Sequence, residues 1–491
     1  MIYTSTRSGC EGISPSLAVL EGLAPDGGLY LPEGLPPSPV ALDQLGQMDP
    51  YNLTAKVVAA LLPDLGEEAV AGAVRKGYEG QFDSAELTPL VPVDGAYVLE
   101  LWHGPTSAFK DMALCVLPYL MAASRKKNGI SEDLLILTAT SGDTGKAALS
   151  GFAGAPHTRV MVFYPEKGVS QVQKAQMVTQ EGENVRVCAV RGDFDDAQRG
   201  VKAALGSFSH PGVRATSANS INVGRLAPQA AYYFAAYGRL LAQGAVQPGQ
   251  KVNFVVPTGN FGNILAGYLA KGMGLPVGKL VCASNENDVL TQFLTTGVYD
   301  RAKRSLVKTA SPSMDILVSS NLERLLYLLA QKSSPREDGA FVRGLMEQLS
   351  REGRYAIPSE MLRRVQEAFC SGRCGDDQAF AAIRSLWEEH GYLMDPHTAV
   401  AWRVYDELRM QGTLPGPTVV LSTASPFKFA PAMLQALGKP VPGNGFAAME
   451  ALSALTGAPI PRGLTGLKEK PVLHRDVIDP EEMKGYIKNN I

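Results

Sequence analysis

Four short segments of the chain carry side chains or backbone groups whose types and spacing could do chemistry. Lys110 lies in residues 101–111 (LWHGPTSAFKD), and glycines or hydroxyls gather in residues 138–145 (TATSGDTG), 255–264 (VVPTGNFGNI) and 422–426 (STASP). A lysine can supply an amine to a reaction. Glycine-containing turns can bring backbone N–H groups close to an anion. The four segments therefore offer one candidate reactive amine and three candidate anion sites.

The segment 255–264 is the clearest of the three turns. Its glycines, Gly259 and Gly262, let the backbone approach a ligand, and consecutive N–H groups at a helix start form a nest for an anion. It is not a Walker P-loop, because GxxxxGK[ST] is absent, and it is not the dinucleotide pattern GxGxxG. Taken alone, two glycines favour a tight strand–helix turn without a ligand.

The other segments are less specific. Residues 138–145 crowd hydroxyls and N–H groups at a predicted helix start, which suits a carboxylate or phosphate, although they could serve only as helix caps. Ser107 and Lys110 form Ser-x-x-Lys, the start of the penicillin-binding pattern, but neither Ser-Asp-Asn nor Lys-Thr-Gly occurs. A lone lysine in an apolar segment is usually a surface residue with a buried stem. A functional role for Lys110 therefore depends on the neighbouring turns.

The elements that must position these segments alternate between short apolar runs and amphipathic stretches. We predict strands at 134–138, 159–163, 185–190, 252–256 and 418–421, and helices at 144–153, 169–180, 195–205 and 263–272. This alternation favours α/β layers with mainly parallel sheet. Three of the candidate turns directly follow predicted strands, where the ligands of open α/β sheets bind.

The ends of the chain have a different composition. The length of 491 residues predicts two or three domains. Residues 1–40 are rich in Gly and Pro and indicate turns between short extended pieces, whereas residues 52–78 have a helical pattern. We therefore predict a separate N-terminal domain at residues 1–88. Residues 441–491 are rich in Gly, Pro and Lys, and we predict only a C-terminal segment that wraps around the rest.

Composition excludes several classes of function. Lys and Arg number 46 against 48 Asp and Glu, a formal net charge of −2, which gives no reason to expect a nucleic-acid or membrane partner. The six cysteines contain no CxxC and the six histidines have no metal spacing, so we expect free thiols and no metal. The N-terminus lacks an apolar stretch of signal-peptide length, and we expect a cytoplasmic protein.

In this chain order, the four segments resemble those of the fold-type II pyridoxal phosphate enzymes. Within that group the chain is similar to the threonine synthases, in their longer form with an N-terminal extension. Residues 21–30 (EGLAPDGGLY), 217–222 (SANSIN) and 395–401 (DPHTAVA) carry the resemblance further, and it covers nearly the whole chain. It implies two mainly parallel α/β domains beside an N-terminal α+β domain. Residues 89–110 and 230–440 would form the large cofactor domain, and residues 111–229 the small substrate-side domain.

The resemblance also implies roles for individual residues. Lys110 would hold pyridoxal 5'-phosphate as an imine and then act as the base that takes the substrate's α-proton. The cofactor phosphate would be bound by Gly259, Asn260, Phe261, Gly262 and Asn263, and Thr423 would face the pyridine nitrogen. The substrate's α-carboxylate would be received by Ser141, Gly142, Asp143 and Thr144. The substrate phosphate would be bound by Ser220, Asn222 and Arg225, with Lys428 as a further cation.

Two departures from the family pattern affect these assignments. Many fold-type II relatives have Asn where this chain has Asp143. An anionic Asp143 beside the cofactor's phenolic oxygen would repel it, so we expect the two groups to share a proton. Ser425 stands where the family usually has His, which removes any role of that imidazole.

The activity implied by the resemblance is conversion of O-phospho-L-homoserine and water to L-threonine and phosphate. Three alternatives stay open: a phospho-lyase that releases a 2-oxo acid, another fold-type II enzyme such as a serine or threonine dehydratase or a cysteine synthase, and a non-catalytic binding protein. Relatives of the longer form favour a monomer, with a dimer as the alternative.

Overall fold

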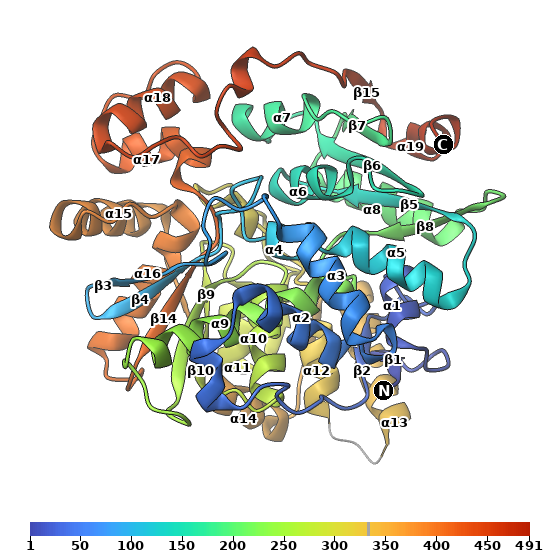
Figure 1. Cartoon of the computed structure of the whole chain (residues 1–491), viewed down its shortest axis with the longest axis horizontal. Coiled ribbons are helices and arrows are strands. Elements are labelled where there is room, and N and C mark those ends of the chain that lie inside the picture. Colours follow the sequence, from blue (N-terminus) through green and yellow to red (C-terminus); the bar gives the residue numbers. More distant parts are fainter. Residues whose placement is uncertain (331–333) are drawn as a thin grey trace.

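The computed structural model describes residues 1–330 and 334–491, and its largest sheet has six strands. Their order is β13 (Phe369–Arg373), β10 (Val277–Ser284), β9 (Val252–Pro257), β14 (Thr418–Ser422), β4 (Ala96–Glu100) and β3 (Leu90–Val93). Every neighbouring pair is parallel except β3 and β4, which are antiparallel. In Figure 1 this sheet occupies the lower left of the molecule.

A second sheet of five strands lies in the upper right of Figure 1. Its order is β15 (Asp476–Ile478), β7 (Val185–Val190), β6 (Thr158–Pro165), β5 (Asp133–Ala139) and β8 (Val213–Ser217). All of its neighbouring pairs are parallel. The prediction of an α/β fold with two mainly parallel sheets is therefore confirmed.

Side chains alternate along the strands between two apolar layers. On β5, Leu134 and Ile136 belong to the main core, whereas Leu135 and Leu137 face a second cluster on the opposite side. On β9, Phe254 belongs to the main core and its neighbour Val255 faces the other way. Both faces of a parallel sheet must be covered, and such strands are therefore continuous apolar runs.

Helices cover these faces. Around the five-stranded sheet lie α5 (Leu117–Asn128), α6 (Asp143–Phe152), α7 (Gln171–Val178), α8 (Phe194–Ser207) and α19 (Met483–Asn489). Around the six-stranded sheet lie α9 (Leu226–Ala242), α10 (Gly262–Gly272), α11 (Val289–Thr296), α14 (Ser359–Ala368), α15 (Asp376–His390) and α16 (Pro396–Met410). No helix in the described parts of the chain is long and apolar enough to cross a bilayer.

The N-terminal region packs on this framework rather than standing apart from it. It contains β1 (Tyr3–Ser5), α1 (Pro15–Glu21), β2 (Tyr30–Pro32), η1 (Leu42–Gln47), α2 (Pro50–Leu61), η2 (Pro63–Leu65) and α3 (Glu67–Tyr78). Helix α2 packs against α9, and α1 and α3 pack against α5. Val57 of α2 and Tyr78 of α3 are fully buried in the same core as both sheets.

Two predictions for the ends of the chain were wrong in part. Residues 1–40 contain helix α1, which the expectation of turns and extended pieces left out. It begins with Pro15 after Ser14, whose side chain accepts the Leu17 N–H, an ordinary helix start. Residues 441–491 also contain more regular secondary structure than the C-terminal segment that we predicted. They hold α18 (Gly445–Thr456), η6 (Leu467–Glu469), η7 (Pro480–Glu482) and α19, and they add β15 to the five-stranded sheet.

The remaining elements are short helices and strands, together with helices α12 and α13. They are α4 (Asp111–Leu114), η3 (Val223–Arg225), β11 (Val298–Asp300), η4 (Pro312–Met314), α12 (Leu322–Ala330), α13 (Pro335–Glu352), β12 (Arg354–Ala356), η5 (Pro426–Phe429) and α17 (Ala430–Ala436). Strands β11 and β12 form a small antiparallel pair. Helix α9 crosses the boundary predicted at residue 229, and the domain limits stay a prediction.

Candidate active site

The carboxyl ends of the parallel strands open on a single cavity. Turns that follow β9 and β14, the start of α6, and the Lys110 segment all reach its wall. The cavity is lined by Phe109, Lys110, Asp143, Thr144, Ser220, Arg225, Gln229, Pro257, Thr258, Gly259, Asn260, Phe261, Gly262, Asn263, Ser313, Met314, His397, Thr423 and Ala424. The structure thus brings all four predicted segments together.

Backbone bonds fix Lys110 beside the turn after β14. The Phe109 N–H donates to the Thr423 carbonyl at 2.9 Å, and the Ser425 N–H donates to the Ser107 carbonyl at 3.1 Å. Ser107 has a φ of 58°, in the left-handed region that a non-glycine residue seldom adopts. These bonds bring Lys110 and Thr423 together, and both residues line the cavity.

The Lys110 amine lies in an environment that favours its uncharged form. Burial lowers the pKa of Lys110, and the nearby cations Lys428 and Arg225 lower it further, while Asp143 opposes them. A lysine must lose its proton to act as a nucleophile or base. Desolvation first and two neighbouring cations second therefore lower the pKa of Lys110, as a nucleophile or base requires.

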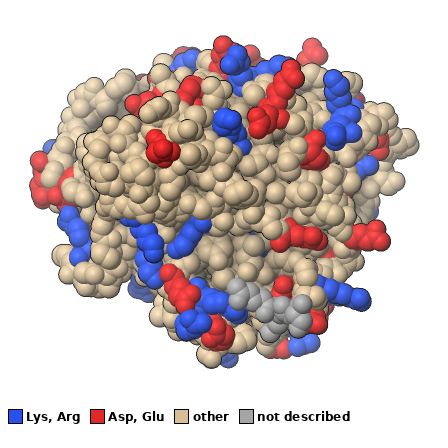
Figure 2. All heavy atoms as spheres, turned by 60° about the horizontal axis from the view of Figure 1, so that its bottom comes forward, with Lys and Arg blue, Asp and Glu red and all other residues tan. Residues whose placement is uncertain are grey.

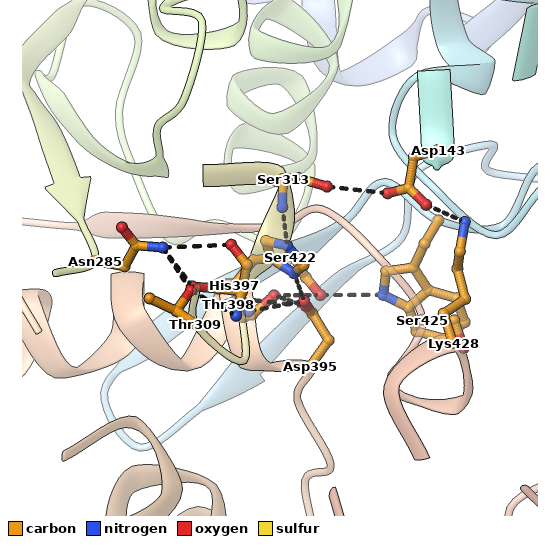
Figure 3. A network of polar contacts seen from close by, with 12 residues as sticks. Asp143, Asn285, Thr309, Ser313, Asp395, His397, Thr398, Ser422, Ser425 and Lys428 are labelled. Carbon is orange, nitrogen blue, oxygen red and sulfur yellow. Dashed lines mark hydrogen bonds and ion pairs between the residues drawn. The ribbon is translucent and has the colours of Figure 1, made fainter. Parts of the chain in front are cut away.

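Asp143 has polar contacts with four side chains of this site, and Figure 3 shows those with Ser313 and Lys428. One carboxylate oxygen, Oδ1, lies 2.6 Å from Lys428 Nζ and accepts from Gln173 Nε2 at 2.9 Å. The other, Oδ2, accepts from Lys110 Nζ at 3.4 Å and from Ser313 Oγ at 3.3 Å. Burial alone would raise the pKa of Asp143, but the charges of Lys428 and Lys110, together with hydrogen bonds from Lys428 and Gln173, hold it below its usual range.

This arrangement changes how Asp143 is understood. The expectation of a shared proton rested on a carboxylate near an anionic oxygen, and it did not include the charge of Lys428. The structure supplies two lysines that stabilise the carboxylate form. Proton sharing with a cofactor oxygen stays a prediction.

The turn after β9 has the geometry of an anion nest. Phe261 has a φ of 61°, and α10 begins at Gly262, so the N–H groups of its first turn have no partner within the helix. A Cβ on Gly259 would lie 2.6 Å from the Ser313 carbonyl oxygen, so only glycine fits there. Asn263 has a buried Nδ2 without a hydrogen-bond partner among the described residues.

These groups fit pyridoxal 5'-phosphate. A phosphate is matched by the free N–H groups at the start of α10. A carbonyl is matched by the Lys110 amine, and a ring nitrogen by the Thr423 hydroxyl, because both side chains line the same cavity. The donor set therefore agrees with the cofactor that the sequence implied.

Arg225 forms a second cationic site in the cavity wall. Its side chain is 2% exposed, Nη1 donates to the Ala218 carbonyl at 2.8 Å, and Nε has no hydrogen-bond partner among the described residues. Burial lowers the pKa of Arg225 to about 10, which leaves it positively charged at neutral pH. Ser220 and Gln229 line the cavity beside it. A buried arginine with an unused donor suits an anionic group.

The structure does not bring every predicted site residue to the cavity. Asn222 is fully buried, and its amide donates to the carbonyls of Val19 at 2.9 Å and Ser217 at 3.0 Å. Its Oδ1 accepts the Gly224 N–H at 2.8 Å. These bonds tie α1 to the segment before η3, so Asn222 acts in the structure as a tether.

Ser141, Gly142 and Lys428 are also outside the cavity lining. Gly142 has a φ of 148°, and a Cβ there would lie 2.6 Å from the Gln173 side chain, so its role is to let the turn pass that residue. Lys428 is fully buried behind Asp143, where it also donates to the Thr106 carbonyl at 2.9 Å. We expected a substrate contact for Lys428; the structure shows a counter-ion to Asp143.

The sequence reasoning missed three polar residues of the site. Ser313 and Gln229 line the cavity, and Gln173 donates to Asp143. None of them belongs to a motif that single-sequence reasoning could use. His397 also lines the cavity, and its Nε2 accepts the Ser313 N–H at 3.1 Å.

The outer surface agrees with the near-zero net charge. On the face drawn in Figure 2, Lys and Arg lie interspersed with Asp and Glu, and a wide central area carries few of either. Within the described residues, no group of three or more His, Cys, Asp or Glu side chains could hold a metal ion. The concentrated positive charge described here lies inside the cavity.

Family models match most of the chain. Residues 82–425 match the model described as pyridoxal-phosphate dependent enzyme. Residues 2–78 match the N terminus of threonine synthase, and residues 398–487 match its C-terminal part.

Relatives of known sequence give the same result. Threonine synthase of Schizosaccharomyces pombe is 38% identical over 464 residues, which cover 89% of both chains. Threonine synthase of Pseudomonas aeruginosa is 38% identical over 441 residues, 89% of this chain and 90% of the relative. Human threonine synthase-like 1 is 39% identical over 439 residues, but the match covers 58% of that longer protein and 86% of this one.

Solved structures extend the similarity to the whole fold. A crystal structure of pyridoxal-phosphate-bound threonine synthase from Brucella melitensis has a TM-score of 0.84 and 36% identity, and the match covers 100% of this chain and 99% of that one. Threonine synthase from yeast has a TM-score of 0.87 and 33% identity, with 100% and 98% covered. The chain therefore belongs to the threonine synthase family of pyridoxal-phosphate-dependent enzymes.

Proposed function

We propose that this protein converts O-phospho-L-homoserine and water to L-threonine and phosphate. The observation that carries the proposal is that one cavity joins Lys110, the nest at the start of α10 and the buried Arg225. Lys110 and the nest suit the cofactor, and Arg225 offers a separate cation for the phosphate of the substrate. A dehydratase acting on serine or threonine has no phosphate to bind and would not need it.

The residues around Lys110 account for the binding of the cofactor. Lys110 would hold it covalently, the N–H groups of residues 259–263 would bind its phosphate, and Thr423 would lie at its ring nitrogen. Bound there, pyridoxal 5'-phosphate supplies the conjugated system that takes up electrons when a carbon-bound proton leaves. A hydroxyl at Thr423, unlike a carboxylate, does not force a proton onto the ring.

Lys110 is the group that moves the substrate's protons. Because burial and two nearby cations lower its pKa, its amine gives up its proton more readily than that of an ordinary lysine, as a base requires. Asp143 lies 3.4 Å from the Lys110 amine and would hold that amine in place. It would remain a carboxylate because Lys428 compensates its charge.

Arg225 and the start of α6 would bind the two anionic ends of the substrate. The unused Nε donor of Arg225, with Ser220 beside it, would receive the phosphate and stabilise it as it leaves. Thr144 lines the cavity in the first turn of α6, where helix N–H groups would receive the α-carboxylate. We include Ser141 and Gly142 in that site as backbone donors only.

Product analysis tests the proposal directly. Purified protein with pyridoxal 5'-phosphate is incubated with O-phospho-L-homoserine, and phosphate, L-threonine and 2-oxobutanoate are measured in the same samples. We expect threonine and phosphate in equal amounts, and no phosphate from Lys110→Ala. Phosphate accompanied by equal 2-oxobutanoate and ammonia would identify a phospho-lyase. Turnover of L-serine or L-threonine without phosphate release would identify a dehydratase.

We also propose a cytoplasmic monomer. The compartment is supported by six cysteines that are all free, as expected where thiols stay reduced. The monomer is supported by the resemblance to the longer form of the threonine synthases. Size-exclusion chromatography with light scattering would test the second statement.

A further inference from the structure

Ser313 occupies a position in the cavity wall that the proposed mechanism does not use. Its hydroxyl donates to Asp143 Oδ2 at 3.3 Å, the same oxygen that accepts from Lys110 Nζ at 3.4 Å. Figure 3 shows the Ser313 hydroxyl pointing at Asp143 on one side of the residue and its backbone N–H pointing at His397 on the other. Ser313 therefore connects the Lys110–Asp143 pair to helix α16.

The backbone of Ser313 is held by a buried Asp–His pair at the start of α16. Asp395 and His397 are 0% and 2% exposed, and His397 Nδ1 lies 2.7 Å from Asp395 Oδ1. A carboxylate accepts, so Nδ1 carries the hydrogen and Nε2 is left as an acceptor. That acceptor receives the Ser313 N–H at 3.1 Å.

The loop on either side of Ser313 is fixed as well. Asp315 accepts from the Thr309 N–H at 3.0 Å, from the Asn285 amide at 2.8 Å and from the Asn287 amide at 3.0 Å. The Ser313 carbonyl lies so close to Gly259 that a Cβ there would be 2.6 Å from it. Ser313 thus has little freedom to move away from Asp143.

We propose that Ser313 is a positioning residue for the Lys110–Asp143 pair, and that Asp395 and His397 act on this pair through the Ser313 N–H. The Ser313 hydroxyl donates to Asp143 Oδ2 and thereby weakens the attraction of that oxygen for a proton on the Lys110 nitrogen. This role deepens the proposed function, because the nitrogen that Ser313 regulates is the one assigned to proton transfer.

The proposal predicts a change in the protonation of the Lys110 nitrogen. Without the Ser313 hydroxyl, the Asp143 carboxylate is less well compensated and favours a proton on that nitrogen more strongly. One hydrogen bond to a charged group corresponds to about one to two pH units at that group, and because Ser313 acts on the Lys110 nitrogen through Asp143 we expect about half of this there, upward. The other charged groups around the pair are Lys428, Arg225 and Asp111, and a change at Ser313 leaves them in place.

The first test is a pH titration of the cofactor absorbance in the holoenzyme without substrate. We expect the midpoint of Ser313→Ala to move upward by about half a unit to one unit and Ser313→Thr to restore it. Ser311→Ala is the matched control, because Ser311 is a buried hydroxyl of the same loop that bonds Asn285 instead of Asp143. An unmoved midpoint in Ser313→Ala, or an equal shift in Ser311→Ala, would overturn the proposal.

The second test asks whether His397 acts through Ser313. His397→Leu removes the acceptor of the Ser313 N–H, and His397→Gln offers an oxygen in its place. We expect an upward shift in His397→Leu, partial recovery in His397→Gln, and no further shift when His397→Leu is added to Ser313→Ala. Additive shifts would refute the coupling of His397 to Ser313.

These readouts are independent of the proposed reaction. The titration needs the cofactor but no substrate, so it decides the role of Ser313 even if O-phospho-L-homoserine is not consumed. Where the substrate is consumed, we expect a lower kcat with an unchanged KM in Ser313→Ala, because the hydroxyl faces Asp143 and Lys110 and not Arg225. A change in KM alone would place Ser313 at the substrate instead and would refute the positioning role.

Discussion

Replacing Lys428 by Met tests the electrostatic design of the site most directly. Lys428 is fully buried, 2.6 Å from Asp143, and Met keeps a long apolar stem while removing the charge. Among the ion pairs of the described residues, the change leaves the buried carboxylate with Lys110, at 3.4 Å. Removing one partner of a buried ion pair typically costs about 3–5 kcal/mol, and the remaining lysine places the expected loss near 3 kcal/mol.

The loss of stability in Lys428→Met should grow as the pH rises. In the unchanged protein the attraction of Lys428 and Lys110 holds the pKa of Asp143 below its usual range against the effect of burial. Such a carboxylate contributes stability above its unfolded pKa, and this contribution disappears as the pH falls through the folded pKa. Without Lys428 the pKa of Asp143 rises, and so does that of Lys110, which Lys428 lowers. The variant binds more protons when folded, so its deficit grows as pH rises.

Thermal unfolding of the holoenzyme at a fixed excess of cofactor measures this deficit. For 491 residues the unfolding entropy is about 1 kcal/mol/K, so a loss near 3 kcal/mol lowers Tm by about 3 °C. We expect this difference near pH 8 and a smaller one near pH 5. Lys439→Met, at an exposed lysine, is the control. A Tm within 1 °C of the unchanged protein, or a deficit that grows toward low pH, would refute the reasoning.

Four further predictions concern single residues. Borohydride should fix pyridoxal 5'-phosphate to Lys110, and mass spectrometry that finds it on another lysine would remove Lys110 from the site. Arg225→Lys keeps the charge but loses the planar contact, so kcat/KM for O-phospho-L-homoserine should fall about 10- to 100-fold; near-normal kinetics in Arg225→Ala would place the phosphate elsewhere. Thr423→Asp should change the absorption spectrum with substrate and the ratio of products, and an unaltered spectrum would show that Thr423 does not face the ring. Asn222→Ala should lower the stability of the fold by about 1–3 kcal/mol in thermal melts, because it leaves buried carbonyls without donors. A changed KM would instead show that Asn222 contributes to substrate binding.

The sequence determined those features that depend on neighbouring residues. Short apolar runs predicted β5, β6, β7, β9 and β14 to within two residues at each end, because a strand in a parallel sheet is buried on both faces. The glycines of residues 255–264 predicted a turn because backbone conformation is local. Helix α1 was missed although Ser14 and Pro15 are a recognisable start, since the surrounding Gly and Pro residues indicated turns.

The tertiary structure decided which side chains meet. Arg225 and Asn222 are three residues apart, yet one faces the cavity and the other ties α1 to β8, because η3 turns them toward different neighbours. Ser313 reaches Asp143 across 170 positions of sequence. No local pattern records such a contact, because it depends on how two packed sheets bring their loops together. The sequence could therefore name a candidate reactive lysine and candidate anion sites, whereas only the fold could show that Lys428 and Ser313 both contact Asp143.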